Sequence, residues 1–124
     1  MSLTNTIVSV DLEILAGYDE AQEEGEPDFV VELIDLYVTE APRFFNAIHE
    51  GLANHDWLSA KRAAHTLRGS SSNLGVLQMA QIADQLEHLT SNQETTGVEL
   101  LQCLRQEFSR VEEIFLAERQ RRMS

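Results

Sequence analysis

Apolar residues spaced three and four apart constrain this chain more than any other feature. Between Phe29 and Leu52 they recur with the period of an α-helix, which predicts one long amphipathic helix. The pattern stays in phase across Pro42, so we expect this proline to bend the helix rather than end it. The apolar positions are Phe29, Val30, Leu33, Ile34, Tyr37, Ala41, Phe44, Ile48 and Leu52.

The same period predicts three further long helices, over residues 57–74, 77–89 and 98–122. A short helix is expected over residues 11–16, closed by Gly17. Four amphipathic helices with short links favour an antiparallel arrangement in which each helix covers the apolar face of its neighbours. The predicted fold class is therefore all-α, an antiparallel up-and-down four-helix bundle with a short extra N-terminal helix.

Residues 1–26 are predicted to form an N-terminal segment with the short helix and an acidic connector, and residues 27–120 to form the bundle. Asp56 suits the N-cap of the second long helix. Gly75 suits a left-handed cap at its end. Thr96 followed by Glu99 fits a capping box for the last helix.

The charge balance excludes several classes of partner. The chain has 124 residues and a net charge of −12, from 21 acidic and 9 basic side chains. Such a chain repels phosphate backbones and anionic lipid surfaces, so neither nucleic acid nor a membrane is expected as a partner. The single cysteine, Cys103, lies in an apolar-periodic stretch and is predicted to be a small core residue. A cytoplasmic location is expected.

One predicted helix carries a group of residues suited to phosphate chemistry. Positions three and four apart share a helix face, so His65 and its neighbours form one stripe that is offset from the core face and should reach solvent. A neutral imidazole is a good nucleophile near neutral pH. The residues of the stripe are Lys61, His65, Arg68, Gly69 and Ser72.

The charges around His65 support this interpretation. Between Trp57 and Ala83 there are three basic residues and no acidic one, whereas the chain up to Glu40 has no lysine or arginine. Lys61 and Arg68 lie about one turn either side of His65, where they can neutralise phosphoryl oxygens. The sequence therefore predicts a local positive patch that binds a phosphoryl group.

Gly69 lies one turn after His65, at a position where glycine costs roughly 1 kcal/mol relative to alanine. Its missing side chain leaves room for a phosphoryl group and for a partner's active site. The sequence also allows simpler explanations. Gly69 could ease helix packing, Lys61 could be an ordinary surface lysine, and His49, His55 and His88 lack comparable neighbours and are expected to be solvated.

The stretch His65-Thr66-Leu67-Arg68-Gly69, followed by small residues and then Leu74-Gly75, resembles the signature of histidine-containing phosphotransfer (HPt) domains. The resemblance extends from the helix at Phe29 to the last helix. One departure is Arg68, where many relatives have lysine. The resemblance implies a four-helix bundle in which His65 exchanges a phosphoryl group with a receiver-domain aspartate, assisted by Lys61, Arg68 and Gly69.

The resemblance also implies the partners, which are receiver domains of response regulators or of hybrid histidine kinases. The domain would then act as a phosphoryl carrier and not as a stand-alone enzyme. It would need no cofactor or metal of its own, since Mg²⁺ is expected on the receiver, and we expect a monomer. Two alternatives remain: a helical-bundle adaptor without phosphoryl chemistry, and the phosphoacceptor module of a larger hybrid or chemotaxis-type kinase.

Overall fold

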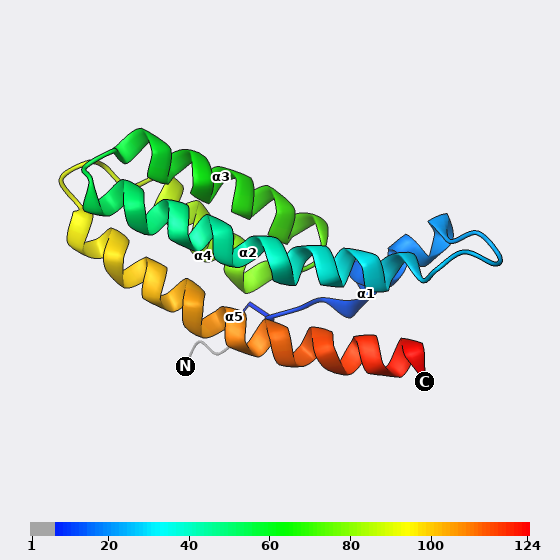
Figure 1. Cartoon of the computed structure of the whole chain (residues 1–124). Coiled ribbons are helices and arrows are strands. Elements are labelled where there is room, and N and C mark those ends of the chain that lie inside the picture. Colours follow the sequence, from blue (N-terminus) through cyan, green and yellow to red (C-terminus); the bar gives the residue numbers. More distant parts are fainter. Residues whose placement is uncertain (1–6) are drawn as a thin grey trace, which may run out of the picture.

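The computed structural model describes residues 7–124, and within this part of the chain every regular element is a helix. Four of them form the bundle: α2 (Phe29–Ala53), α3 (Trp57–Asn73), α4 (Leu77–Glu87) and α5 (Glu94–Met123). Each runs antiparallel to the one before it, and short loops join them at the ends of the bundle (Figure 1). The predicted all-α, up-and-down four-helix bundle is thus confirmed.

The N-terminal segment adds the predicted short helix, α1 (Leu12–Ala16), with the Asp11 carboxylate capping the backbone N–H of Glu13. A 3-10 helix over Gly17–Ala21 follows directly, so part of the predicted connector is helical. Residues 1–6 of the predicted segment lie outside the described residues. The division of the chain at residues 26 and 27 stays a prediction.

The predicted caps of α3 are confirmed. The Asp56 carboxylate accepts the backbone N–H of Ser59 at 3.2 Å, and Gly75 has a φ of 77° just beyond the end of the helix. The capping box at Thr96 is wrong, because α5 already begins at Glu94. The Gln93 side-chain oxygen closes the preceding turn by accepting the N–H of Thr90 at 2.8 Å.

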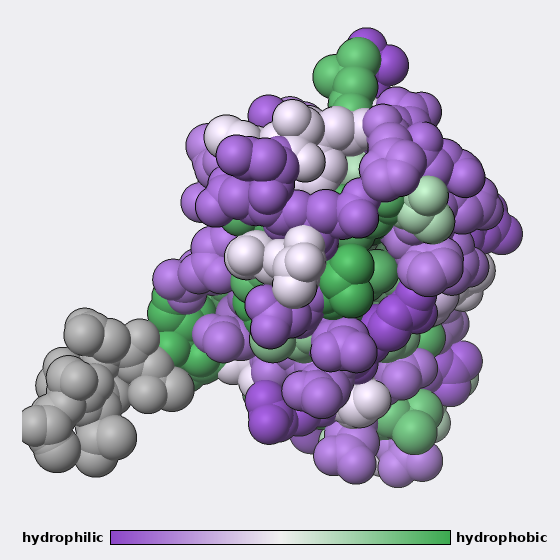
Figure 2. Space-filling model, turned by 90° about the vertical axis from the view of Figure 1, so that its left-hand side faces the viewer, coloured by the Kyte–Doolittle hydropathy of each residue, from purple (hydrophilic) through white to green (hydrophobic). Residues whose placement is uncertain are grey.

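Apolar side chains from all four long helices and from α1 fill one continuous core, while hydrophilic residues cover most of the end of the bundle seen in Figure 2. Helix α2 continues through Pro42, as predicted. On this helix, Phe45 and not the predicted Phe44 is fully buried in the core. The prediction for Cys103 is wrong, since its side chain is exposed. Among residues 7–124 no helix is both long and apolar enough to span a bilayer.

One buried polar contact ties α2 to α3. The hydroxyl groups of Tyr37 and Ser71 lie 2.7 Å apart, and both side chains are buried. Burial raises the pKa of Tyr37 far above its usual value, so this phenol stays protonated and hydrogen-bonded. The contact fixes the C-terminal half of α3, one and a half turns beyond His65.

Candidate functional site

The predicted stripe on α3 faces solvent, as its spacing indicates. Ala64 and Leu67 point into the core and anchor the helix on either side of His65. The His65 side chain, by contrast, is 61% exposed. Because its neighbours on the core face are fixed by packing, the imidazole is presented from a rigid element rather than from a mobile loop.

Glu87, near the end of α4, defines the orientation of the His65 ring. Its Oε2 lies 2.6 Å from Nδ1 of His65, the shortest contact in the site. An ionised carboxylate can only accept a hydrogen bond, so Nδ1 carries the proton. Nε2 is then left with its lone pair, which makes it the nucleophilic nitrogen of the ring.

Arg68 completes a three-residue cluster with His65 and Glu87. Its Nε donates to Glu87 Oε1 at 2.9 Å, while its Nη2 lies 3.2 Å from Nδ1 of His65. A guanidinium cannot accept a hydrogen bond, so it competes with Glu87 for Nδ1. The shorter, charge-assisted contact with Glu87 prevails, and the contact between Nη2 and Nδ1 places a positive charge beside the ring without a hydrogen bond.

The cluster keeps the carboxyl group of Glu87 ionised. Partial burial of this group favours its neutral form, but hydrogen bonds from His65 and Arg68 outweigh the burial and lower the pKa of Glu87 below its usual value. The acceptor of the Nδ1 proton is therefore charged throughout the neutral pH range.

The predicted positive patch needs correction, because α4 brings acidic groups to it. Arg68 lies within 4 Å of both Asp84 and Glu87. In the sequence, these two acids come just after the stretch that has no acidic residue. Lys61 is half-buried one turn before His65 and forms no ion pair with any residue from 7 to 124. The site is thus a mixed cluster in which Glu87 balances Arg68.

Gly69 lies one turn after His65 on the exposed side of α3. A β-carbon at this position would meet no atom of residues 7–124 within 4 Å beyond its own helix and chain neighbours. The alternative in which Gly69 eases helix packing is therefore not supported. The open space beside His65 is what the sequence predicted for an approaching partner.

The remaining histidines, His49, His55 and His88, are exposed, as expected. Ligand atoms of Asp84, Glu87 and His88 lie within 4.8 Å of one another, so these residues could approach a cation. The two oxygens of Glu87 already bond His65 and Arg68, however. We therefore assign Glu87 to the His65 cluster and not to a metal site.

Sequence reasoning missed Glu87, the residue closest to the His65 ring. The sequence signal that could have indicated it was the polar edge of the predicted helix over 77–89. Asp84 and Glu87 lie three residues apart there, on a helix that must run antiparallel to the one carrying His65. Choosing between the two acids required the register of α4 against α3, which the sequence pattern does not provide.

Comparisons with known proteins identify the family of the bundle. The family model described as "Hpt domain" matches residues 32–114. Histidine-containing phosphotransfer protein 5 of Arabidopsis thaliana is 30% identical over 88 residues, which are 68% of this chain and 55% of that protein. The chain thus spans about half the length of this curated relative.

A solved structure shares the whole fold. The crystal structure of histidine-containing phosphotransfer protein B (HptB) from Pseudomonas aeruginosa PAO1 matches with a TM-score of 0.81 at 26% sequence identity. The match covers 94% of this chain and 98% of that one. All three comparisons therefore extend well beyond the short stretch around His65.

Proposed function

The chain belongs to the Hpt domain family, and on this premise we propose that it is a phosphorelay intermediate whose phosphoryl carrier is His65. A role in histidine phosphotransfer follows from the family. The proposal adds the residue and the direction: His65 accepts the group from the aspartate of one receiver domain and passes it to a second. The observation that carries it is the bond between His65 Nδ1 and Glu87 Oε2 at 2.6 Å.

The transfer step follows from this bond. The lone pair on Nε2 attacks the phosphorus of the receiver's aspartyl phosphate, and the bond between phosphorus and the acyl oxygen breaks. The aspartate leaves as a carboxylate with that electron pair, and a P–N bond forms at Nε2. No proton leaves Nε2 during attack, because the ring's proton is on Nδ1. The positive charge that develops on the imidazole is offset by Glu87.

The second half of the relay is the reverse reaction with another receiver. Its aspartate carboxylate attacks phosphorus, the P–N bond breaks, and the electron pair returns to Nε2. Arg68 and Lys61 stabilise phosphoryl oxygens in both directions, since they flank His65 about one turn away. The Mg²⁺ ion of the reaction belongs to the receiver, and this domain needs no cofactor of its own.

A receiver could dock on a surface that includes residues of α3 following His65. A groove of about 280 Å³ runs between α2 and α3, and Leu67, Ser70 and Asn73 of α3 are among the residues that line it. Leu36, which is 59% exposed, lies on its opposite wall. An apolar groove lined in part by residues that follow the carrier histidine suits an apolar helix of the receiver and would bring the receiver's aspartate to Nε2.

The test is phosphoryl transfer from a phosphorylated receiver to the wild-type chain and to His65→Gln. His65→Gln should stay folded, because the side chain is exposed, and should accept no acid-labile, base-stable phosphate. His88→Gln is the matched control, since His88 is also exposed and also lies near an α4 carboxylate, with Nδ1 3.4 Å from Asp84. Wild-type labelling of His65→Gln would show that another residue is the carrier.

A further inference from the structure

A second feature lies on the side of α4 that faces α5, away from the His65 cluster. One face of each helix contributes to a groove with a volume of about 490 Å³, which we call the α4–α5 groove. This volume is within the range of small-molecule sites. The lining residues are Ile7, Gln78, Gln81, Ile82, Gln85, Leu100, Cys103, Gln106, Glu107 and Arg110.

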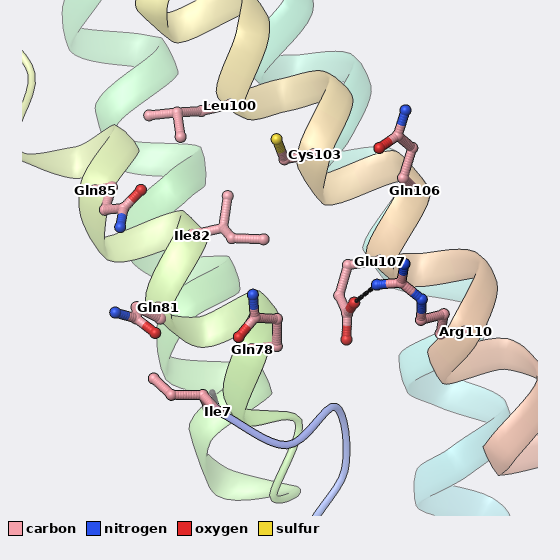
Figure 3. A pocket seen from close by; sticks show the side chains of 10 residues that line it. All are labelled: Ile7, Gln78, Gln81, Ile82, Gln85, Leu100, Cys103, Gln106, Glu107 and Arg110. Carbon is pink, nitrogen blue, oxygen red and sulfur yellow. Dashed lines mark hydrogen bonds and ion pairs between the residues drawn. The ribbon is translucent and has the colours of Figure 1, made fainter. Parts of the chain in front are cut away.

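The groove contains a buried carboxylate that is only half satisfied. The Glu107 side chain is 3% exposed, and its Oε1 accepts a hydrogen bond from Arg110 Nη1 at 2.8 Å. Its Oε2 is buried and has no hydrogen-bond partner among residues 7–124. Figure 3 shows Glu107 reaching from α5 toward α4, with the dashed bond to Arg110 on one side only.

A largely buried acid on the same helix, Glu118, offers a comparison. The side chain of Glu118 is 10% exposed, and its two oxygens accept hydrogen bonds from Arg121 and Arg122. Arg122 in turn pairs with Asp19 and Asp28. Glu107 differs from Glu118 in this respect, although an unpaired buried carboxylate oxygen is costly.

The surroundings define which donor suits Glu107. Arg110 balances one charge but is 71% exposed, so water screens much of its effect. Glutamine amides on both helices supply further neutral acceptors, and Ile82 and Leu100 supply apolar surface for a short carbon stem. The chain as a whole carries a charge of −12, which attracts cations and repels anions.

We propose that the α4–α5 groove is a binding site for a small molecule that carries a primary ammonium group, with the buried Glu107 carboxylate as its acceptor. The ammonium donates to Oε2, its remaining hydrogens reach glutamine carbonyl oxygens, and the stem covers Ile82. The site uses the edge of α4 opposite Glu87, so it is separate from the face where a receiver would dock.

Cys103 provides a test in the unaltered protein, since it is the only cysteine and lies on the wall of this groove (Figure 3). The measurement is its alkylation rate with iodoacetamide, followed by mass spectrometry at constant ionic strength. With n-butylammonium at ten times its dissociation constant, alkylation should slow by about tenfold, because about one site in ten stays free. The neutral isostere n-butanol should give no saturable protection.

Two variants of equal charge identify the acceptor. Glu107→Gln should raise the dissociation constant of n-butylammonium by about tenfold or more, since it removes a charge-assisted hydrogen bond. Glu113→Gln removes the same charge from an exposed position of α5 and should leave the constant unchanged. Equal protection by n-butanol, no protection by n-butylammonium, or equal affinity in Glu107→Gln would overturn the proposal and leave water as the partner of Oε2. The comparison of the two ligands on wild-type protein decides the matter even if Glu107→Gln fails to fold.

Discussion

Two neighbouring turns, one within α3 and one at its C-terminal end, have opposite roles, although both belong to the stretch that resembles the HPt signature. The reactive turn, His65–Gly69, presents an imidazole that is 61% exposed and a glycine beside open space. The closing turn, Ser71–Gly75, is anchored by the buried hydroxyl of Ser71, which bonds Tyr37. Its Gly75 carbonyl accepts the backbone N–H of Asp11 at 2.7 Å and so holds the N-terminal segment in place.

The two turns differ in what occupies the space beside their glycines. At Gly69 the space is outside the molecule and available to a partner. At Gly75 the space is filled by the molecule itself: a β-carbon there would lie 2.6 Å from the Asp11 carbonyl oxygen. One short stretch therefore combines a reactive surface with a structural joint, and substitutions in the two turns should impair phosphotransfer for different physical reasons.

The largest effect on stability should come from Gly75→Ala, which breaks the closing turn and leaves the reactive turn unaltered. The positive φ of 77° and the clash with Asp11 together should lower the free energy of unfolding by at least about 2 kcal/mol. Thermal unfolding followed by circular dichroism should show Tm reduced by roughly 5–10 °C. The folded fraction of the variant should still accept phosphate on His65.

Gly25→Ala is the matched control for that prediction. Gly25 has a similar φ of 88°, but a β-carbon there would meet no atom of residues 7–124 within 4 Å. Its substitution should cost only the conformational part, about 1 kcal/mol. An equal loss in both variants would mean that the contact between Gly75 and Asp11 contributes nothing to stability.

Most of the fold around these two turns could be predicted from the sequence. Period and caps located α3 within one residue, because Asp56 and Gly75 act through local geometry that a sequence displays directly. The start of α5 was missed by four residues. It depends on the turn closed by Thr90 and Gln93, whereas Thr96 offered a competing capping pattern.

For the candidate site, the sequence predicted the residues that α3 itself contributes. The stripe containing Lys61, His65, Arg68 and Gly69 follows from spacing along one helix, and its exposure agrees with that spacing. Glu87 could not be assigned in this way, since its contact with His65 spans 22 residues and depends on how α4 packs against α3. The predicted positive patch was wrong for the same reason.

The second prediction removes the partner of the reactive turn on α4 and spares the closing turn. Glu87→Ala removes the acceptor of the Nδ1 proton and the charge that offsets the developing imidazolium. Phosphoryl transfer should slow by about tenfold or more. Arg68 and His65 keep part of their charge screened by solvent, with side chains 36% and 61% exposed, so loss of these ion pairs should lower Tm only modestly. Nitrogen-15 NMR of the His65 ring should show the proton of the neutral imidazole moving from Nδ1 toward Nε2 in the variant.

Asp84→Ala is the control, since Asp84 lies 3.8 Å from Arg68 and, among the residues that the structure describes, forms no ion pair with His65. It should leave both the tautomer and the transfer rate near wild-type values. If Asp84→Ala slows transfer as much as Glu87→Ala, the effect of Glu87 is general electrostatics and not ring orientation.

The lowered pKa of Glu87 adds a pH dependence with a defined sign. A carboxyl group whose pKa is lower in the folded state stabilises the fold above its unfolded-state pKa, near the ordinary glutamate value of 4.5. That contribution is lost as the pH falls through the folded-state pKa. Below this range wild type and Glu87→Ala should converge in Tm. A difference in Tm that persists in acid would assign Glu87 a packing role instead.

The smallest effect should come from the reactive turn's own glycine, where stability and function should move in opposite directions. Gly69→Ala replaces a poor helix former with the best one, in open space and without a positive φ, and should stabilise the fold by roughly 0.5–1 kcal/mol. Gly69→Gln should also raise Tm, but its side chain would lie one turn from Nε2 and slow transfer from a receiver. Paired measurements of Tm and transfer rate test both. If both variants lose stability, Gly69 fills a packing role like that of Gly75, and the distinction between the two turns fails.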